Sequence, residues 1–289
     1  MMPPTITCHR PTTLAEACQL GHDHNGNARF LAGGTEVVVD LKQERISVEH
    51  LISLRHIEGL DGIGTEEGSL RIGALVRLAA IARSEEVAGH FPVLRQATGY
   101  IGSAQIRCQG TIGGNFCGGV PCADTPPVCI AGEARLRIAG LDGEREMAAD
   151  EFFRAPRETA LQPGELLTEV VIPPQPSGSG ASYQRFSLRR GSALAVASVA
   201  ARIVLSEGII TDARVVLGAV APVPLPAVAC ADLLAGRPPA EDLFQQAAEA
   251  AMAEARPITD IRGSESFRRY LVRTLTLRAL AQATERAGG

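Results

Sequence analysis

The sequence predicts an α+β protein of two domains. Its 289 residues correspond to about two domains of about 150 residues each. Residues 173–180 (PPQPSGSG) form the clearest break in composition. Their prolines restrict the backbone, their glycines and serines leave it flexible, and none of them provides a large apolar side chain to bury. After this break, apolar β-rich runs come first and Ala-rich segments follow, which is the order typical of an α+β domain. We therefore expect one domain at residues 1–177 and a second at residues 178–289.

Before the break, strands and helices are predicted in turn. Residues 13–16 (TLAE) form a capping box that opens a short helix reaching residue 20. Pro92 suits the first position of another helix, which reaches about residue 101. The other predicted elements are strands at residues 29–32, 50–54, 69–72, 134–138 and 166–172, and a helix at residues 75–87 with apolar side chains at helical spacing.

After the break, residues 193–205 and 209–220 are apolar and β-rich. The residues between them, Ser206, Glu207 and Gly208, predict a β-hairpin. Residues 241–255 and 264–287 are rich in Ala with interspersed Arg and Glu, and they predict two helices. Four arginines of the last helix favour a solvated face over a partner contact: Arg268, Arg269, Arg273 and Arg278.

Composition excludes several classes of protein. Hydrophobic residues make up 45% and charged residues 21% of the chain, which is typical of a globular protein rather than a disordered one. A net charge of −4 provides no basic surface for nucleic acid, and the absence of Trp disfavours base stacking. No secretory signal or apolar run of about 20 residues is evident, and seven cysteines form an odd set that favours reduced thiols. We therefore expect a cytoplasmic protein without a membrane span or a nucleic-acid partner.

Two Gly-Gly sequences are the strongest candidates for a ligand site. Gly33-Gly34 precedes Thr35, and Gly113-Gly114 lies between Thr111 and Asn115. Without a Cβ, such a segment brings backbone N–H groups close to an anion, and two of them suit a ligand with two linked phosphates. Glycine spacing alone is equally compatible with two tight strand-to-strand turns. The chain contains no G-x-G-x-x-G, phosphate-loop, H-E-x-x-H or G-x-S-x-G sequence.

Other reactive side chains predict no metal site. Four cysteines are spaced C-x8-C-x4-C-x6-C without a C-x2-C pair, which favours small reduced thiols over a zinc or iron–sulfur site. His22 and His24 lie in a polar loop without companion ligands, which favours solvated side chains. Asp124 precedes a rigid Pro-Pro pair, where it either caps a turn or accepts a hydrogen bond from a ligand. The four cysteines are Cys108, Cys117, Cys122 and Cys129.

The residues around the glycines resemble the FAD-binding (medium or β) subunits of molybdenum hydroxylases. This family includes the medium subunit of aerobic carbon monoxide dehydrogenase, the FAD domain of xanthine dehydrogenase and the β subunit of 4-hydroxybenzoyl-CoA reductase. The resemblance covers nearly the whole chain. It is carried by residues 30–36 (FLAGGTE), 105–107 (QIR), 110–115 (GTIGGN), 121–124 (PCAD), 164–173, 183–190 and 268–273 (RRYLVR).

The resemblance implies a fold and a cofactor site. The fold is an FAD-binding domain of the vanillyl-alcohol oxidase/PCMH type with subdomains at about residues 1–55 and 56–177, followed by a smaller domain with an antiparallel sheet and a helical bundle. Both glycine sequences would wrap FAD, Asp124 would hydrogen-bond it, and Tyr183 and Arg185 would lie near the isoalloxazine, where a positive charge stabilises reduced, anionic flavin. The implied cofactor-binding residues are Leu31, Ala32, Gly33, Gly34, Thr35, Glu36, Val37, Thr111, Ile112, Gly113, Gly114, Asn115, Asp124, Tyr183 and Arg185.

The resemblance also implies a function. The chain would be an electron-transfer subunit without catalytic residues of its own, taking electrons from a small 2Fe-2S subunit and passing them to an external acceptor. A large subunit with the molybdenum cofactor would oxidise the substrate, and the complex would be a dimer of heterotrimers. Two alternatives stay open: a stand-alone flavin oxidoreductase, and a non-catalytic scaffold subunit that has lost FAD.

Three departures from the family pattern stand out. Ala193 occupies a position where relatives usually have Asp, and Cys108 one where they often have Asn. The cysteine-rich insertion that carries a 4Fe-4S cluster in the 4-hydroxybenzoyl-CoA reductase β subunit is missing between Asn115 and Asp124, so we expect no cluster.

Overall fold

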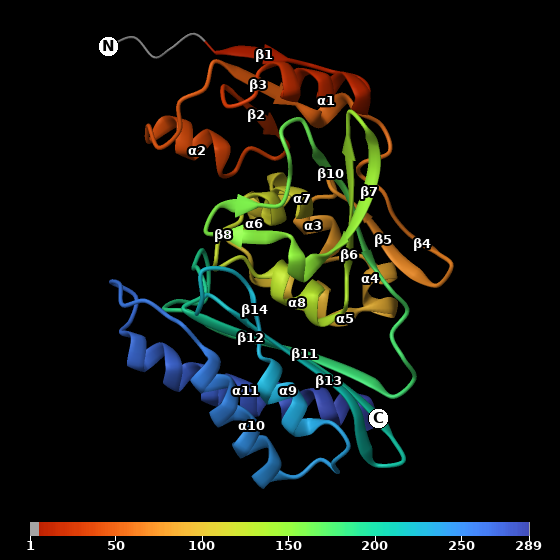
Figure 1. The fold of residues 1–289 in the computed structure, drawn as a ribbon, viewed down its shortest axis with the longest axis vertical. Helices are drawn as coiled ribbons and strands as arrows, with labels where there is room; N and C mark the ends of the chain where they lie inside the picture. The colour runs from red at the N-terminus through yellow and green to blue at the C-terminus, as the bar shows by residue number, and fades with distance from the viewer. Residues whose placement is uncertain (1–5, 289) are drawn as a thin grey trace.

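The computed structural model describes residues 6–288 and arranges them in three layers stacked along the longest axis of the molecule (Figure 1). The N-terminal layer (residues 6–56), the central layer (residues 57–172) and the C-terminal layer (residues 179–288) each contain one main sheet and helices. The predicted α+β class is therefore confirmed. None of the helices within residues 6–288 combines the length and the apolar character that a membrane span requires.

The N-terminal layer is built on a parallel sheet of three strands. Its elements are β1 (Thr7–His9), α1 (Leu14–Asp23), β2 (Ala28–Leu31), α2 (Val37–Lys42), β3 (His50–Ser53) and a 3-10 helix at Leu54–His56, with the strands in the order β1-β3-β2. Thr13 caps α1 by accepting a hydrogen bond from the Glu16 N–H at 3.2 Å, which confirms the predicted helix start. Ala17 and Cys18 of α1 and Ile52 of β3 belong to one buried cluster, so α1 covers one face of this sheet.

The central layer is an antiparallel sheet of five strands with short helices packed against it. The strands are β4 (Ile63–Glu66), β5 (Ser69–Gly73), β10 (Leu166–Ile172), β6 (Arg135–Gly140) and β7 (Gly143–Ala148), in that spatial order. The helices are α3 (Leu78–Ile81), α4 (Glu85–His90), α5 (Pro92–Tyr100), α6 (Ala104–Gln109), α7 (Ile112–Cys117) and α8 (Thr125–Ala131). A 3-10 helix at Ala149–Glu151 and the short strands β8 (Phe153–Ala155) and β9 (Glu158–Thr159) complete the layer.

The single helix predicted at residues 75–87 is wrong. The structure has two short helices there, α3 and α4, and residues 75–77 connect β5 to α3. Ser84 separates the helices, because its hydroxyl accepts the Val87 N–H at 3.2 Å and so caps α4. Leu78, Ile81 and Val87 are all buried, so the apolar spacing continues across a break that the cap imposes.

The C-terminal layer is an antiparallel sheet covered by three helices. Its elements are β11 (Ser179–Phe186), β12 (Ala197–Ser206), β13 (Ile209–Gly218), β14 (Leu225–Pro226), α9 (Val228–Leu234), α10 (Glu241–Glu254) and α11 (Glu265–Gly288). Glu207 and Gly208 both have positive φ, of 50° and 76°, which suits a tight turn and confirms the hairpin between β12 and β13. The two long helices predicted in this region are confirmed as α10 and α11.

The C-terminal sheet is buried on both faces. Helix α11 packs along β11 and β12, and helix α8 of the central layer contacts β12 and β13 from the other side. Ala197–Ile203 are accordingly all buried, Ser198 and Arg202 included, which explains why most of this stretch is apolar without a regular polar alternation. One face of the C-terminal sheet therefore shares a core with the central layer, and the other face forms a second core with α9, α10 and α11.

The burial of Arg268 contradicts the prediction that this arginine lies on a solvated face of the last helix. Its side chain is only 2% exposed and donates hydrogen bonds to the Val196 carbonyl at 2.7 Å and the Ala219 carbonyl at 3.2 Å. It also pairs with Asp260 at 2.7 Å. Arg268 thus ties α11 to the sheet, because a buried guanidinium needs several acceptors.

Candidate functional site

The first glycine segment (residues 31–37) connects β2 to α2. Figure 1 shows α2 at the side of the N-terminal layer that faces α6 and α7 of the central layer. Gly34 has a φ of +73°, which disfavours any residue with a Cβ. At Gly33, a Cβ would lie 2.0 Å from the carbonyl oxygen of Gln109 and 3.0 Å from the Cα of Gly110. The two predicted glycine segments are therefore brought together, since the backbone of the first touches the residues just before the second.

The first glycine segment has unused backbone donors. Among the residues that the structure describes, the N–H groups of residues 33–37 donate to no backbone or side-chain acceptor. Most of these residues are partly exposed, so a ligand has access to them. Successive free N–H groups in a glycine-containing segment form a concave site for an anion. The segment therefore has the chemistry to hold a phosphate.

The second glycine segment (residues 111–115) is the start of a helix, so its interpretation as a strand-to-strand turn is wrong. Thr111 caps α7, and its hydroxyl accepts the Gly114 N–H at 3.1 Å while its carbonyl accepts the Asn115 N–H at 3.0 Å. The N–H groups of Ile112 and Gly113 donate to the central layer. These acceptors are the Val76 carbonyl at 3.0 Å and the Ala74 carbonyl at 2.9 Å. The backbone donors of residues 112–115 are thus already used within the protein.

Gly113 and Gly114 serve different purposes. A Cβ on Gly113 would lie 2.7 Å from the Cβ and the carbonyl oxygen of Ala74, so glycine lets α7 pack directly on the central layer. A Cβ on Gly114 would approach only its own cap, Thr111 Oγ1, at 3.1 Å, and Gly114 is exposed. Gly114 therefore leaves open space beside the first turn of α7.

Asp124, Tyr183 and Arg185 form a buried polar cluster. The Tyr183 hydroxyl donates to Asp124 Oδ1 at 2.6 Å, and Arg185 Nη1 lies 3.0 Å from Asp124 Oδ2. The side chains of Asp124 and Arg185 are each 6% exposed. Asp124, which the resemblance assigns to a hydrogen bond with FAD, is therefore adjacent to Tyr183 and Arg185, which it places near the flavin ring, although Asp124 precedes α8 and the other two belong to β11.

Burial determines how these groups titrate. Burial raises the pKa of Asp124 to about 6, and the Arg185 charge and the Tyr183 hydrogen bond limit this rise. Burial and the neighbouring Asp124 carboxylate raise the pKa of Tyr183 well above its ordinary value. The phenol of Tyr183 therefore stays protonated and donates to Asp124. The Asp124 carboxylate thus holds the side chains of Tyr183 and Arg185 in place.

The cluster is connected to the second glycine segment and to the loop before β12. The Thr125 hydroxyl donates to Asn115 Oδ1 at 2.6 Å. Arg185 donates to the Tyr100 carbonyl at 2.9 Å and to the Ala193 carbonyl. At the position where the family usually has Asp, Ala193 thus offers its backbone oxygen to Arg185. Sequence reasoning missed Tyr100, because nothing local marks a carbonyl that becomes a partner 85 residues away.

Sequence reasoning also missed the residues that fasten the first glycine segment. Asp40 of α2 is buried and pairs with Arg157 at 2.8 Å. Arg157 has a φ of 64°, and its N–H donates to the Gly119 carbonyl at 2.8 Å. Arg157 therefore links α2 to the residues after α7. A single Arg in a loop gives no sequence signal for this role.

Comparison with known proteins decides the family. The domain described as "FAD binding domain in molybdopterin dehydrogenase" matches residues 4–175, and the "CO dehydrogenase flavoprotein C-terminal domain" matches residues 181–283. The chain belongs to the FAD-binding subunits of the molybdenum hydroxylases. The resemblance stated from the sequence, including the fold that it implies, is therefore confirmed.

Individual members of this molybdenum hydroxylase family match along their whole length. The chain is 33% identical to the carbon monoxide dehydrogenase medium chain of Afipia carboxidovorans, over 99% of both proteins. It is 29% identical to the xanthine dehydrogenase FAD-binding subunit of Escherichia coli O157:H7, over 97% of both. The solved structure of carbon monoxide dehydrogenase from Hydrogenophaga pseudoflava superposes with a TM-score of 0.96 at 32% identity, covering 99% of both chains. These relatives are dehydrogenase subunits, which confirms the prediction of an oxidoreductase subunit.

Proposed function

We propose that this chain holds FAD between its two glycine segments and transfers electrons within a molybdenum hydroxylase complex. The free N–H groups of residues 33–37 carry this proposal, because they match the phosphate chemistry of FAD. When bound, FAD supplies a redox centre that accepts electrons from an iron–sulfur partner and passes them to an external acceptor. Family membership supports the same role.

The residues present fit a cofactor with a pyrophosphate. The first glycine segment offers five successive donors, from Gly33 to Val37, for which residues 6–288 provide no competing acceptor. In the second segment, the Thr125 hydroxyl occupies Asn115 Oδ1 and leaves the amide nitrogen of Asn115 free to donate. The open space beside Gly114 gives a ligand room to approach α7. We infer that residues 31–37 and 111–115 contact FAD from two sides.

Asp124 and Tyr183 act as positioning residues for Arg185 in this proposal. Both oxygens of Asp124 accept hydrogen bonds from Arg185, and Oδ1 also accepts one from Tyr183. The guanidinium is therefore held in one orientation by a carboxylate and two backbone carbonyls. The proposed task of Arg185 is to provide a fixed positive charge near the flavin ring.

Substitution of Arg185 tests this task. Arg185→Met removes the charge, so we expect a flavin reduction potential lower by tens of millivolts and a loss of about 3–5 kcal/mol in the free energy of unfolding, because Asp124 loses its buried partner. Arg185→Lys keeps the charge and is the matched control. Spectroelectrochemical titration measures the potential, and equal potentials in the Met and Lys variants would contradict the proposal.

Purification of the chain tests FAD binding itself. We expect a yellow protein with flavin absorbance and one FAD per chain. A colourless protein that folds and still joins its partners would favour the scaffold alternative. Turnover of a substrate by the isolated chain would favour a stand-alone flavin oxidoreductase. These outcomes separate the three functions that the sequence left open.

We propose a large molybdenum-cofactor subunit and a small 2Fe-2S subunit as partners, assembled as a cytoplasmic dimer of heterotrimers. The support is that similar proteins are described as medium chains or FAD-binding subunits, which implies further subunits in their complexes. We also propose domains at residues 1–177 and 178–289, with subdomains at about 1–55 and 56–177. Co-expression with the neighbouring genes and the mass of the purified complex test this composition.

A further inference from the structure

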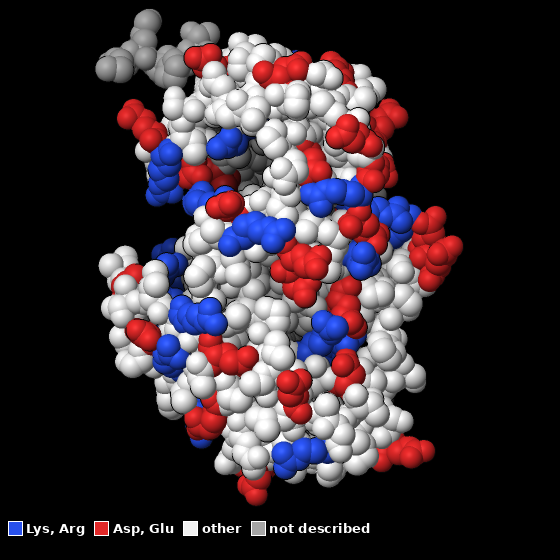
Figure 2. Space-filling view, viewed as in Figure 1, with Lys and Arg blue, Asp and Glu red and all other residues white. Residues whose placement is uncertain are grey.

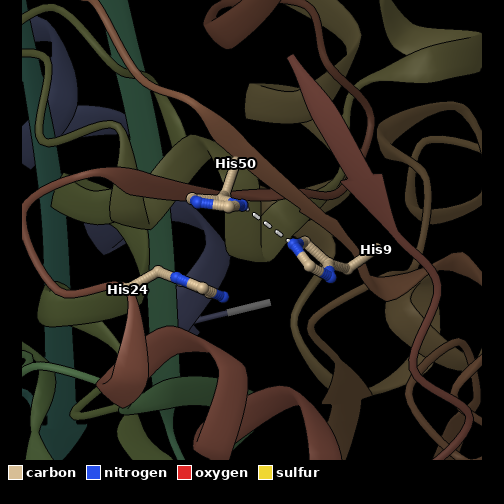
Figure 3. Close-up of side chains that lie close together, drawn as sticks. All are labelled: His9, His24 and His50. Atoms are coloured by element: carbon tan, nitrogen blue, oxygen red, sulfur yellow. Dashed lines mark hydrogen bonds between the residues drawn. The ribbon is translucent and has the colours of Figure 1, made fainter. Parts of the chain in front are cut away.

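Three histidines converge at one end of the N-terminal layer. His9, His24 and His50 each place a ring nitrogen within 4.8 Å of those of the other two (Figure 3). Within residues 6–288, they are the only group of three or more His, Cys, Asp or Glu side chains with metal-ligand spacing. His9 Nε2 and His50 Nδ1 lie 3.0 Å apart, and the rings of His24 and His50 stack with centroids 3.8 Å apart. We call these three residues the histidine cluster.

The sheet brings two of these histidines to one face. In the register of the parallel pair, Thr7 lies opposite His50 and His9 opposite Ile52. Side chains alternate between faces along a strand, so His9 and His50 share the face of Ile52. Helix α1 packs on that face, and His24 is its C-terminal cap residue. Three different elements therefore deliver the three rings, which is why the sequence placed His24 in a loop without companion ligands.

Backbone hydrogen bonds hold the histidine cluster in place. The His50 N–H donates to the Asn27 carbonyl at 3.1 Å, and the Asn27 N–H donates to the His24 carbonyl at 2.9 Å. The Thr7 N–H donates to the Glu49 carbonyl at 2.8 Å, which fastens β1 beside the start of β3. These hydrogen bonds fix the backbone around the cluster. Its side chains must still adjust, because an ion would replace the hydrogen bond between His9 and His50, and the ring of His24, which stacks on His50, must turn to direct a nitrogen at the same ion.

The geometry points to a site for one divalent transition-metal ion of the zinc class, held by His9, His24 and His50. Imidazole nitrogen is a preferred ligand of Zn²⁺, Ni²⁺ and Cu²⁺, and three protein ligands with an open fourth position form a known type of zinc site. Tetrahedral Zn²⁺ with Zn–N distances of about 2.0–2.1 Å separates two ligand nitrogens by about 3.3 Å. The observed 3.0 Å between His9 and His50 requires little movement to reach that separation.

A metal takes the neutral form of imidazole, so binding of an ion at the histidine cluster releases any protons that the ring nitrogens carry at the ligand positions. Because the ion would join β1, α1 and β3, its binding would stabilise the N-terminal layer, which carries the first glycine segment.

Zinc titration of the purified flavoprotein tests this site. The protein is prepared without a histidine tag, freed of metal with a chelator, and titrated with Zn²⁺ in a calorimeter. We expect one tightly bound Zn²⁺ per chain and a higher unfolding temperature with Zn²⁺. His24→Gln should weaken this binding by about a hundredfold or more, because removal of a ligand costs at least as much as removal of a supporting residue. His22→Gln, two positions away on an exposed side chain, is the matched control and should bind like the parent.

A set of variants separates zinc at the histidine cluster from zinc at exposed thiols. Cys8, Cys108 and Cys117 are exposed, and thiols are also zinc ligands, so the decisive quantity is the difference in Zn²⁺ affinity between His24→Gln and His22→Gln. Unchanged flavin content and circular dichroism show that His24→Gln has folded. His50→Gln provides a second variant from another element and should show the same loss. Equal Zn²⁺ affinity in all three variants, or no saturable binding by the parent, would overturn the proposal.

Discussion

The two glycine segments have similar sequences and opposite backbone chemistry. In the described part of the chain, five N–H groups of residues 31–37 have no acceptor, whereas residues 112–115 donate all of theirs to Thr111 and to the central layer. The first segment is held from outside, through Gln109 and the Asp40–Arg157 pair. The second is held by its backbone hydrogen bonds to its cap, Thr111, and to the Ala74 and Val76 carbonyls. The pattern Gly-Gly therefore predicts close approach of the backbone, but it does not predict which partner approaches.

The face of the molecule in Figure 2 is mixed in charge, with acidic and basic side chains interspersed over all three layers. Elsewhere in the described structure, charged side chains also pair with one another, as Arg145 does with Glu165 at 2.6 Å and Arg71 with Glu169 at 2.8 Å. Attraction of an anionic cofactor thus depends on local donors such as the free N–H groups rather than on a long-range field.

Of the substitutions that test the difference between the two glycine segments, Gly33→Ala is expected to have the largest effect on FAD content and stability. The added Cβ would lie 2.0 Å from the Gln109 carbonyl oxygen, so the first segment must move away from the second. We expect the loss of most bound FAD and of about 3 kcal/mol in the free energy of unfolding. Flavin absorbance per chain and urea denaturation provide the measurements. Gly62→Ala, where an added Cβ meets nothing within 4 Å, is the control. Full flavin content in Gly33→Ala would show that the contact between the segments is dispensable.

Local signals explain how much of the fold was predictable. The cap at Thr13, the helix start at Pro92 and the hairpin turn at Gly208 each depend on neighbours in the sequence, and all three predictions hold. The predicted helix at residues 75–87 failed because the apolar spacing outweighed the capping signal of Ser84, although that signal is also local. The prediction of a solvated Arg268 was wrong because the acceptors of its side chain, the carbonyls of Val196 and Ala219, lie outside α11 and far away in the sequence.

The candidate site shows the same division between features with a local sequence signal and features that depend on contacts between distant elements. The glycines and Asp124 stood out from their sequence neighbours, but the use of each backbone donor depends on how α7 packs against Ala74 and Val76. The histidine cluster depends on a strand register that joins residues 41 positions apart. Chemistry that is assembled from several elements therefore appears only with the fold.

Thr111→Ala should have an intermediate effect. It removes the cap of α7, so we expect a loss of about 1 kcal/mol in the free energy of unfolding. The substitution also frees the Gly114 N–H, which makes the second segment more like the first. Thr111→Ser keeps the hydroxyl and should behave like the parent. If Thr111→Ala lost as much FAD as Gly33→Ala, the second segment would bind the cofactor through this hydroxyl, and the contrast between the segments would fail.

Gly114→Ala should have the smallest effect on stability and the most specific effect on FAD. Glycine in a helix is less favourable than Ala by up to about 1 kcal/mol, and at Gly114 no close neighbour other than Thr111 Oγ1 and no positive φ requires glycine. The substitution should therefore leave the free energy of unfolding of the FAD-free protein unchanged or slightly higher. If FAD occupies the open space beside α7, its affinity should fall several-fold, as measured by fluorescence titration with FAD. Unchanged affinity would mean that FAD stays away from Gly114, and only the first segment would then hold the pyrophosphate.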